Sequence, residues 1–378
     1  MRRIVALDML RGYALVCIML DHMPIGLLRN ITLTNFTVFD AAELFVLLSG
    51  FLVGMVWVKV EARQGRRVAQ LRFLRRAAQV WLALIAGAVL LALFSALLFR
   101  LHMNHTAVWF QYARWIFEHP IGYVATVALM WMQPNLLDVL ALYVLLIATV
   151  PVTVPFLLRM PWIALAVSAA IWWFADPLNA LIPNQRPGPG LLFNPFGWQL
   201  LFFAGVAMGA FRDRIMPVLR RHGRLLTAVS TGILLFSLAI VLSWKFGPAT
   251  KGLSVFLSQI TGGIDKWSLD FVRLIAILAA SWLVAVPLAR PFAWMAGTKP
   301  GEALADIGRG GLFSFIICVL LSIWGDALDM TVPQGGAVWF WMRLAIDLWL
   351  IVTFWAIAAL WMRRDRWLPP LRARLRLD

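Results

Sequence analysis

The sequence predicts an all-α polytopic membrane protein with about ten transmembrane helices and both termini in the cytoplasm. Two observations support this fold class. The first is composition, since 62% of the 378 residues are hydrophobic and 14% are charged, whereas soluble domains are about half apolar and about a quarter charged. The second is the recurrence of apolar runs of about twenty residues, the length that crosses roughly 30 Å of hydrocarbon.

Apolar segments follow one another along the whole chain. We place them at 5–28, 39–58, 76–99, 135–157, 162–182, 196–211, 225–244, 268–288, 310–325 and 336–361. No internal repeat, low-complexity tract or soluble domain interrupts them, so residues 1–378 are expected to form one transmembrane domain. Cys17 and Cys318 both fall inside apolar segments, which predicts neither a disulfide framework nor a metal site.

The net charge of +16 is explained by the positions of the basic residues. With the N-terminus in the cytoplasm, 24 of the 34 Lys and Arg residues fall in cytoplasmic loops and tails, including 59–76, 212–224 and 363–376. Cytoplasmic loops of membrane proteins carry such an excess. Because no basic module with interleaved polar surface is present, nucleic-acid binding is not expected.

Two of the loops that face the periplasm in this topology have a distinctive composition. The longer one, 100–134, mixes aromatic residues such as Trp109 and Trp115 with polar side chains, which is typical of an amphipathic helix in the membrane interface. The other, 184–196, is rich in proline and glycine and is expected to be constrained.

The first segment carries unusual charge for a membrane helix, since LDMLRGYALVCIMLDH (7–22) contains four ionisable side chains. On a helix, Asp8 and Arg11 share a face, and His22 lies within about 20° of Arg11 and roughly 16 Å beyond it toward the periplasm. This stripe must face the bundle interior or a water-filled cavity. Two interpretations stay open: a structural Asp8–Arg11 ion pair with a packing histidine, or a functional site.

The second segment, DAAELFVLLSGFLVG (40–54), brings carboxylates to the same depth. Asp40 and Glu43 share a helix face. Because this segment descends from the periplasm, they are expected at the level of His22. A carboxylate beside a histidine orients the imidazole and raises its basicity, so these three residues form a candidate acid–base group.

Further segments add small and polar residues. Gly50 and Gly54 form a small-xxx-small seam that lets helices approach closely. Asp138 in the fourth segment, and Arg343 with Asp347 in the tenth, extend the buried polar set. Since Arg343 and Asp347 are four residues apart, mutual neutralisation explains them equally well.

The first segment resembles the first-helix signature of the bacterial type-3 membrane acyltransferases, an Asp followed after three residues by Arg-Gly and after fourteen by His. Asp8, Arg11, Gly12, Ala14 and His22 match it. Later stretches look like successive blocks of the OpgC family and together span nearly the whole chain: NFTVFDAAELFVLLSGFLVG, QPNLLDVLALYVLL, LLFNPFGWQLLFFAGVAMG, DKWSLDFVRLIAILA and LADIGRGGLFSFIICVLLS. OpgC proteins are inner-membrane enzymes that add succinyl groups to osmoregulated periplasmic glucans.

The resemblance implies a multi-pass succinyltransferase of the bacterial inner (cytoplasmic) membrane, built as a single transmembrane acyltransferase domain. It implies that His22 takes the place of the essential histidine, and Asp8 and Arg11 those of the conserved Asp and Arg. The expected partners are succinyl-CoA (an acyl-CoA) as donor substrate, a periplasmic glucan as acceptor, and the lipid bilayer. No tightly bound cofactor is expected. The acyl group, the glucan and the oligomeric state do not follow from the sequence.

We assign roles to individual residues on chemical grounds. His22 is expected to act as general base on the sugar hydroxyl, oriented by Glu43 or Asp40. Donor binding is assigned to Asp8, Arg11, Arg66, Arg67, Arg273 and Arg309. The guanidinium groups of cytoplasmic residues such as Arg66, Arg67 and Arg309 suit the CoA phosphates. Acceptor binding is assigned to Asp138, Asn194, Trp198, Gln199 and Lys266.

Several of these roles have structural alternatives. Trp198 is expected to stack on a sugar ring, but Asn194, Trp198 and Gln199 are explained equally well by capping and anchoring the sixth segment. Arg273 suits the free carboxylate of a succinyl group, but Asp270, three residues earlier, is an alternative partner for it.

Two other mechanistic classes stay open. A transporter or flippase of a glycan or acyl precursor would use the buried charges as a proton relay, although no inverted repeat is visible; it predicts substrate movement without a new ester. A ping-pong enzyme would form a covalent acyl-His22, and it predicts a labile acyl group on the protein when only the donor is present. The sequence has no G-x-S-x-G elbow that would indicate a serine nucleophile.

Overall fold

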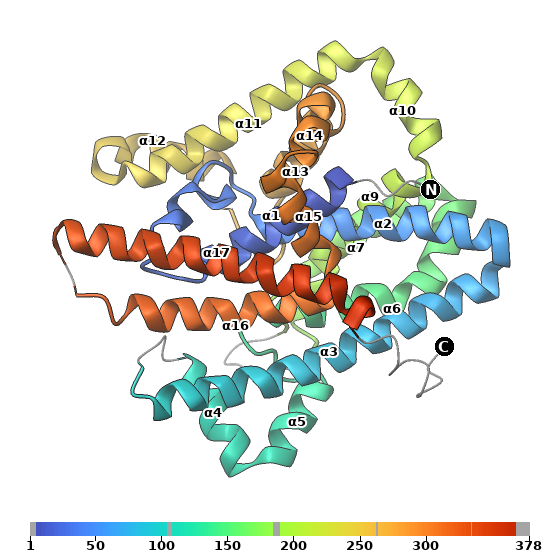
Figure 1. The fold of residues 1–378 in the computed structure, drawn as a ribbon. Helices are drawn as coiled ribbons and strands as arrows, with labels where there is room; N and C mark the ends of the chain where they lie inside the picture. Colours follow the sequence, from blue (N-terminus) through green and yellow to red (C-terminus); the bar gives the residue numbers. More distant parts are fainter. Residues whose placement is uncertain (1–4, 104–107, 184–189, 262–263, 334, 368–378) are drawn as a thin grey trace. The chain divides into compact units, whose positions relative to one another are not determined.

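The computed structural model is all-helical in the part of the chain that it describes, residues 5–103, 108–183, 190–261, 264–333 and 335–367 (Figure 1). The chain divides into two compact units. The terminal unit comprises Met1–Thr32, Leu98–Thr106 and Ala289–Asp378, and the central unit comprises Leu33–Leu97 and Ala107–Leu288.

The terminal unit joins the first helix of the chain to its last ones. Its helices are α1 (Val5–Asp21), η1 (Leu28–Ile31), α14 (Ala289–Ala296), α15 (Lys299–Arg309), α16 (Leu312–Asp329) and α17 (Gly336–Trp367). Helix α1 packs on α15 and α16, and α16 lies beside α17 (Figure 1).

The central unit holds the remaining helices, apart from residues 98–100 at the end of α3, which belong to the terminal unit. They are η2 (Leu33–Asn35), α2 (Ala41–Gln64), α3 (Arg66–Arg100), α4 (Val108–Glu118), α5 (Pro120–Ala128), α6 (Asp138–Arg159), α7 (Pro161–Trp173), α8 (Ala175–Asn179), α9 (Pro195–Ala210), α10 (Arg212–Arg221), α11 (Gly223–Lys245), η3 (Gly247–Thr250), α12 (Lys251–Thr261) and α13 (Phe271–Ala285). Helix α2 packs along α9, and α11 lies beside α13.

Glycines permit a close helix crossing in each unit. A β-carbon on Gly50 or Gly54 of α2 would overlap backbone carbonyl oxygens of α9, and Gly205 and Gly209 of α9 are equally close to the α2 backbone. The seam predicted from Gly50 and Gly54 is therefore confirmed. In the terminal unit, Gly12 of α1 and Gly308 of α15 make the same kind of contact with each other's helix.

In the part of the chain that the structure describes, six helices are long and apolar enough to cross a membrane: α2, α3, α6, α11, α16 and α17. Helices α13 and α14 would make a seventh span as a pair. Each of the ten predicted segments contains helix, but α1, α7 and α9 have 17, 13 and 16 residues. The described chain is thus multi-pass by its candidate spans, and ten crossings and the side of the termini stay predictions.

Several predicted boundaries were wrong, mostly where proline and glycine interrupt the apolar pattern. Helix α1 ends at Asp21 rather than at residue 28, because Pro24 and Gly26 follow it. Helix α13 ends at Ala285, two residues before Pro287. The opposite error occurs in α16, which continues to Asp329 instead of ending at residue 325.

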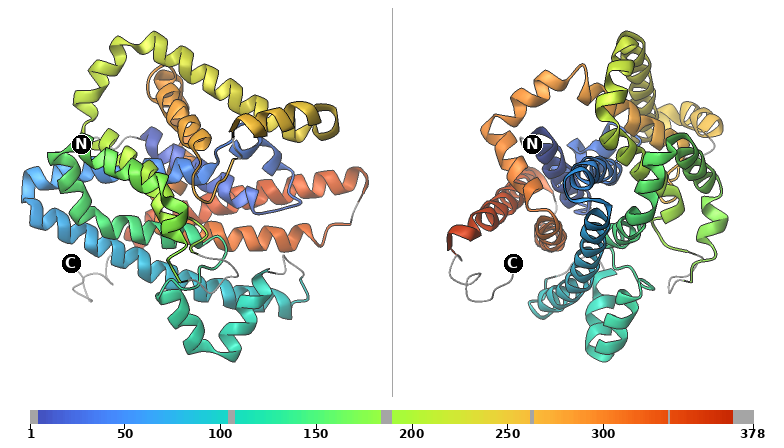
Figure 2. Two further views of the ribbon diagram at one scale, coloured as in Figure 1. Left: turned by 180° about the vertical axis from the view of Figure 1, so that it is seen from behind. Right: turned by 90° about the vertical axis from the view of Figure 1, so that its right-hand side faces the viewer.

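The stretch between the third and fourth segments is helical, as expected. The α4–α5 pair lies against α3 (Figure 2), where the Tyr123 hydroxyl donates to the Ala88 carbonyl at 2.9 Å. Trp115 packs edge-on against Tyr123 with ring centroids 5.8 Å apart. The side chain of Trp109 and residues 184–189 of the Pro/Gly-rich loop lie outside the described part.

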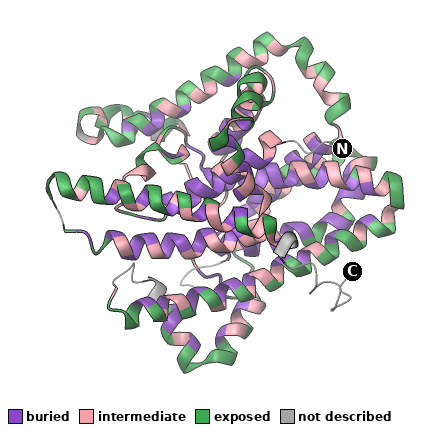
Figure 3. Cartoon of the chain, viewed as in Figure 1, coloured by how far each residue is buried: buried purple, intermediate pink, exposed green. Residues whose placement is uncertain are grey.

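Burial is uneven among the long helices (Figure 3). Two thirds of the apolar window of α2 is buried, against 22% for α11 and 28% for α17. The remaining surface of α11 and α17 is apolar, with side chains such as Leu235 and Trp341 exposed. In a bilayer, lipid covers such apolar helix faces. A helix tolerates this contact because its backbone polar groups are hydrogen-bonded within the helix.

Candidate functional site

His22 lies directly after the last residue of α1, and its side chain is exposed. Its Nδ1 is 2.7 Å from the Ile18 carbonyl oxygen. A carbonyl oxygen only accepts, so Nδ1 carries the proton and Nε2 is the basic nitrogen of the neutral ring. This is the tautomer that a general base acting through Nε2 requires.

The segment after His22 is held against α17 by two buried charged side chains. Arg343 Nη1 donates to the Ile25 carbonyl oxygen at 3.1 Å, and the Leu28 N–H donates to Asp347 Oδ2 at 2.8 Å. Arg343 and Asp347 are 2% and 0% exposed. Arg343 and Asp347 therefore each bind a backbone group in the segment after His22. The interpretation in which the two side chains only neutralise each other did not include these contacts.

Two more contacts shape this segment. The Thr32 hydroxyl donates to the Asp21 carboxylate at 2.5 Å, which closes the loop that begins at His22. A β-carbon on Gly26 would lie 3.1 Å from Asp347 Oδ1, so a larger residue would press on the carboxylate.

Helix α16 adds buried acids that the sequence analysis missed. Asp326 and Asp329 are both 0% exposed, and Asp329 lies within electrostatic range of Asp347, Arg343 and Asp326. Neither carboxylate oxygen of Asp329 has a hydrogen-bond partner among the described residues. The i,i+3 spacing of two acids was visible in the sequence, but the predicted segment ended at residue 325.

At the other end of α1, Asp8 is buried and Arg309 Nε lies 3.6 Å from its carboxylate. Arg309 Nη1 also lies 2.7 Å from Asp306. Two carboxylates therefore already neutralise the guanidinium that we had assigned to donor phosphate. An Asp8–Arg11 pair stays a prediction.

A cleft of about 590 Å³ opens beside Arg309 in the terminal unit. Its lining is formed by Val5, Ala6, Ala293, Ala296, Gly297, Glu302, Asp306 and Arg309. With two acids against one base, this cleft does not suit a polyphosphate.

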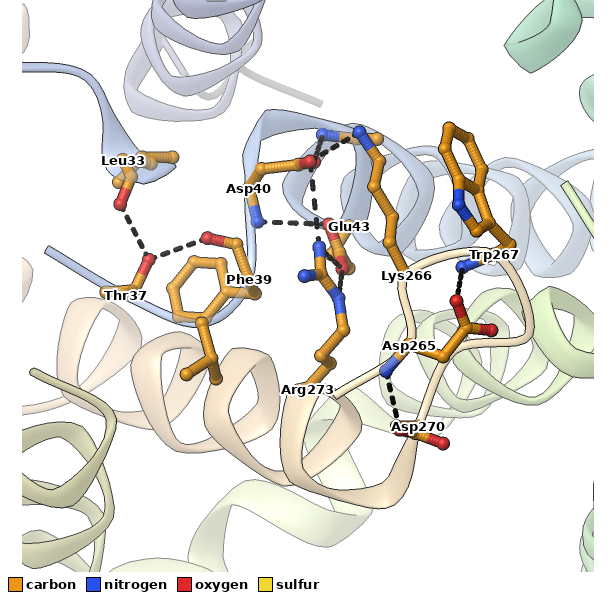
Figure 4. A network of polar contacts seen from close by, with 12 residues as sticks. Leu33, Thr37, Phe39, Asp40, Glu43, Asp265, Lys266, Trp267, Asp270 and Arg273 are labelled. Carbon is orange, nitrogen blue, oxygen red and sulfur yellow. Dashed lines mark hydrogen bonds and ion pairs between the residues drawn. The ribbon is translucent and has the colours of Figure 1, made fainter. Parts of the chain in front are cut away.

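Four charged side chains meet at the start of α2 in the central unit (Figure 4). Asp40 caps the helix by accepting the Ala42 N–H at 2.7 Å, while Glu43 accepts the Asp40 N–H at 3.1 Å, a reciprocal capping box. Lys266 Nζ lies 2.6 Å from Asp40, and Arg273 Nε donates to Glu43 at 2.6 Å. Arg273 also lies 3.6 Å from Asp40.

These contacts balance two carboxylates with two cations in a mostly buried site. Burial alone would lower the pKa of Lys266, but the charge of Asp40 and its hydrogen bond raise it above the ordinary lysine value. Glu43 is fully buried. Removal of one member of a buried ion pair is strongly destabilising, because the other charge is left buried without compensation.

The network differs from what the sequence led us to expect. Asp40 and Glu43 contact Arg273 and Lys266, while their proposed orientation of His22 stays a prediction. Arg273 contacts Glu43 rather than Asp270. The carboxylate of Asp270 instead accepts the Asp265 N–H at 2.6 Å.

The predicted acceptor residues at the start of α9 have structural contacts. Asn194 caps the helix with its side-chain oxygen. Gln199 bonds Ser168 through both ends of its amide, at 2.5 and 2.7 Å. Trp198 is 0% exposed, and its indole N–H donates to the Trp267 carbonyl oxygen at 3.0 Å. The stacking role expected for Trp198 is contradicted, because no face of its ring is open to a sugar.

The remaining residues predicted to bind donor or acceptor lie at helix ends. Asp138 begins α6 and is buried, and its Oδ1 accepts the Val139 N–H at 2.9 Å. Arg66 pairs with Glu61 at 2.8 Å where α2 meets α3, and Arg67 beside it is exposed.

The loop before α13 contains polar and aromatic residues that we did not single out. The Ser268 hydroxyl donates to Asp176, and Asn194 Nδ2 lies 3.3 Å from Asp176 and 3.2 Å from Ser268. The Trp267 side chain is 41% exposed. The available signal was the block DKWSLD, in which tryptophan stands among charged residues directly before an apolar helix.

The model of the OpgC protein family matches residues 3–366. No curated protein sequence matches the chain. The matched range takes in both units and includes His22, Asp40, Glu43, Lys266, Arg273, Arg343 and Asp347. The resemblance seen in the sequence blocks is confirmed, and this chain belongs to the OpgC family.

Proposed function

We propose that the protein is a membrane O-acyltransferase that moves a succinyl group from cytoplasmic succinyl-CoA to hydroxyls of periplasmic glucans. The observation that carries the proposal is the OpgC match over residues 3–366, since OpgC proteins succinylate such glucans. The candidate spans support a membrane location. We propose the inner membrane, with both termini in the cytoplasm.

In this proposal His22 is the general base. Its Nδ1–H is held by the Ile18 carbonyl, so Nε2 takes the proton of a glucan hydroxyl. The hydroxyl oxygen attacks the thioester carbonyl carbon, a new C–O bond forms and the C–S bond breaks. The departing CoA thiolate then takes up a proton, which leaves His22 neutral for the next cycle.

The arginines proposed to bind the donor differ in whether they already pair with acidic side chains. Arg67 is exposed and forms no ion pair with an acidic side chain in the described part of the chain, which suits a phosphate. Arg66 already pairs with Glu61, and Arg309 with Asp306 and Asp8. We therefore propose Arg67 as the first of these residues to test for donor binding.

The proposal is tested in cells that lack their own glucan acyltransferase and express the parent protein, His22→Ala or His119→Ala. His119 is an exposed histidine in the α4–α5 turn and serves as the matched control. Periplasmic glucans are analysed by anion-exchange chromatography and mass spectrometry. We expect succinylated glucans with the parent and His119→Ala, and a loss of about 10²-fold or more with His22→Ala. Unmodified glucans from the parent, at equal membrane abundance, would reject the enzyme.

A transporter is the second candidate, and one observation favours it. Asp326, Asp329 and Asp347 are fully buried in the terminal unit, and buried acids are typical of proton relays. Purified protein in liposomes separates the alternatives. Movement of glycan or acyl precursor without a new ester would support the transporter. A labile acyl group retained on the protein after incubation with donor alone would support acyl-His22.

A further inference from the structure

We propose that Trp267 is the stacking surface of a carbohydrate-binding subsite in the central unit, with Asp176, Ser268 and Lys266 at its polar edge. The choice of a glucan as ligand rests on the proposed function. The geometry of the subsite rests on contacts within one compact unit.

The backbone of Trp267 is rigidly held. Its carbonyl oxygen accepts from the Asn194 N–H at 2.9 Å and from the Trp198 indole at 3.0 Å. Its own N–H donates to Asp265 Oδ1 at 3.1 Å, and the other oxygen of Asp265 accepts the Ser268 N–H at 2.7 Å. The loop is therefore ordered before any ligand arrives, which lowers the entropic cost of binding.

The ring of Trp267 is held by neighbouring side chains and is still partly exposed. Phe193 packs against it edge to face with centroids 5.3 Å apart. Lys266 comes from the same loop, and its Nζ lies over the Trp267 ring, 5.5 Å from the centroid (Figure 4). The side chain remains 41% exposed, whereas Trp198 is 0% exposed. An exposed, pre-positioned indole offers a flat apolar face of the kind on which the C–H face of a pyranose stacks.

Polar side chains belong to the loop that carries Trp267 or contact it. Asp176 is exposed and accepts from the Ser268 hydroxyl, and Asn194 Nδ2 lies within 3.3 Å of it. Lys266 adds three N–H donors, of which Asp40 engages at least one at 2.6 Å. A carboxylate, a hydroxyl and an ammonium in or in contact with the loop that carries an exposed indole match the hydroxyls and the C–H surface of a sugar.

A membrane-interface belt is the alternative explanation for exposed tryptophans. Trp173 provides the comparison, since the neighbouring Trp172 bonds the Leu269 carbonyl at 2.8 Å and so places this part of α7 near the same loop. Trp173 is 74% exposed, but it lies on a helix surface without the side-chain hydrogen bonds that fix the Trp267 backbone. A belt role predicts similar behaviour for both residues, and a sugar subsite predicts a difference.

Equilibrium binding separates these explanations. The probe is unsubstituted periplasmic glucan purified from acyltransferase-deficient cells, titrated calorimetrically into full-length protein in nanodiscs. Each variant is made in the His22→Ala background so that no transfer occurs. We expect Trp267→Ala to raise Kd at least tenfold, Trp267→Phe to have a smaller effect, and Trp173→Ala to leave Kd unchanged. The subsite would be overturned if Trp267→Ala and its parent had equal Kd, or if Trp173→Ala weakened binding as much as Trp267→Ala. Absence of binding by the parent would overturn it as well.

A kinetic arm distinguishes failure of the subsite from failure of the proposed function. With His22 intact, Trp267→Ala is expected to raise KM for glucan and leave KM for succinyl-CoA unchanged. Transfer with an unchanged KM for glucan would overturn the subsite and keep the enzyme. Trp267-dependent binding without any transfer by the parent would keep the subsite and reject the acyltransferase. Equal unfolding temperatures of the variants would show that the effect is local.

Discussion

Single residues at the central site depend on partners far away in the sequence. Glu43 is fully buried, and its cation, Arg273, comes 230 residues later. Breaking a buried pair by removing one member typically costs about 3–5 kcal/mol, because the other charge is left without compensation. The same reasoning applies to Asp40 and Lys266, although the Lys266 side chain is 30% exposed.

The Lys266–Asp40 pair should give stability a defined pH dependence. We expect Lys266→Met to lower the free energy of unfolding at neutral pH by roughly 1.5–3 kcal/mol, the range for hydrogen bonds to charged groups. The folded-state pKa of Lys266 is raised. The contribution of the pair is therefore complete below the unfolded pKa of about 10.4 and is lost as pH rises through the folded value.

Thermal unfolding in detergent, from neutral pH to about pH 11.5, measures this effect. The difference between parent and Lys266→Met should shrink at the alkaline end. Lys251→Met, at an exposed lysine, should show no comparable difference at any pH. A gap that stays constant to the highest pH would contradict the assignment.

Asp347 should determine the conformation of the segment beside His22. Asp347→Ala removes the acceptor of the Leu28 N–H, which typically costs about 1–3 kcal/mol when a buried donor is left unsatisfied. Asp347→Asn keeps an acceptor oxygen at the same place. We expect Asp347→Ala, but not Asp347→Asn, to change the rate at which His22 reacts with diethyl pyrocarbonate, followed by mass spectrometry. Identical rates in both variants and the parent would show that α17 does not position His22.

At the scale of helices, the sequence predicted positions better than ends. Apolar runs placed a helix in every predicted segment because burial of such runs, in protein or in lipid, dominates over local propensity. The ends were set by local chemistry, as at Pro24 after α1 and at Pro287 after α13. The i,i+4 glycines of α2 predicted a crossing correctly, but not that α9 would be the partner.

The candidate site was predictable residue by residue but not as an assembly. Asp40, Glu43, Lys266 and Arg273 were all singled out from the sequence, yet nothing in a single sequence pairs residues more than 200 positions apart. The sequence also did not indicate which tryptophan side chains are exposed. Trp198 begins one apolar helix and Trp267 precedes another, and both rings pack edge-on against Phe193. Only the folded structure shows that the Trp198 ring is buried and that Trp267 is 41% exposed.

The α2–α9 crossing should tolerate no added side chain at its glycines. Gly50→Val would push branched atoms into the α9 backbone, and overpacking of this kind typically costs about 1–3 kcal/mol or more. Gly232 of α11 has no atoms within 4 Å of an added β-carbon and serves as the control. We expect loss of detergent-stable protein for Gly50→Val and near-parent yield for Gly232→Val. Equal yields would show that the helices do not meet at Gly50.

At the scale of the whole molecule, the topology depends on whether the short helices α7 and α9 cross the membrane. Helices α7 and α9 have 13 and 16 residues, or about 20 and 24 Å, which is less than roughly 30 Å of hydrocarbon. Their directions support crossing nonetheless. The end of α7 meets the loop before α13 through Trp172, and the start of α9 meets it through Asn194. The two helices therefore run in opposite directions from a shared end.

Thiol labelling decides whether these short helices cross. If ten segments cross, Ala180 lies at the periplasmic end of the fifth segment, whereas Met160 and Asp213 lie in cytoplasmic loops. The basic residues of 212–224 favour the cytoplasm for the second of these loops. If only the six long helices cross, all three positions share one side, because none of those six lies between residues 160 and 213. All three are exposed, and the native Cys17 and Cys318 are buried, so the parent is the blank. A membrane-impermeant maleimide applied to intact spheroplasts should then label Ala180→Cys alone, with Met160→Cys and Asp213→Cys reacting only after permeabilisation. Labelling of all three together, before or after permeabilisation, would reject the ten-crossing topology. It would also remove the periplasmic position that this topology assigns to Trp267, in the loop between the seventh and eighth segments.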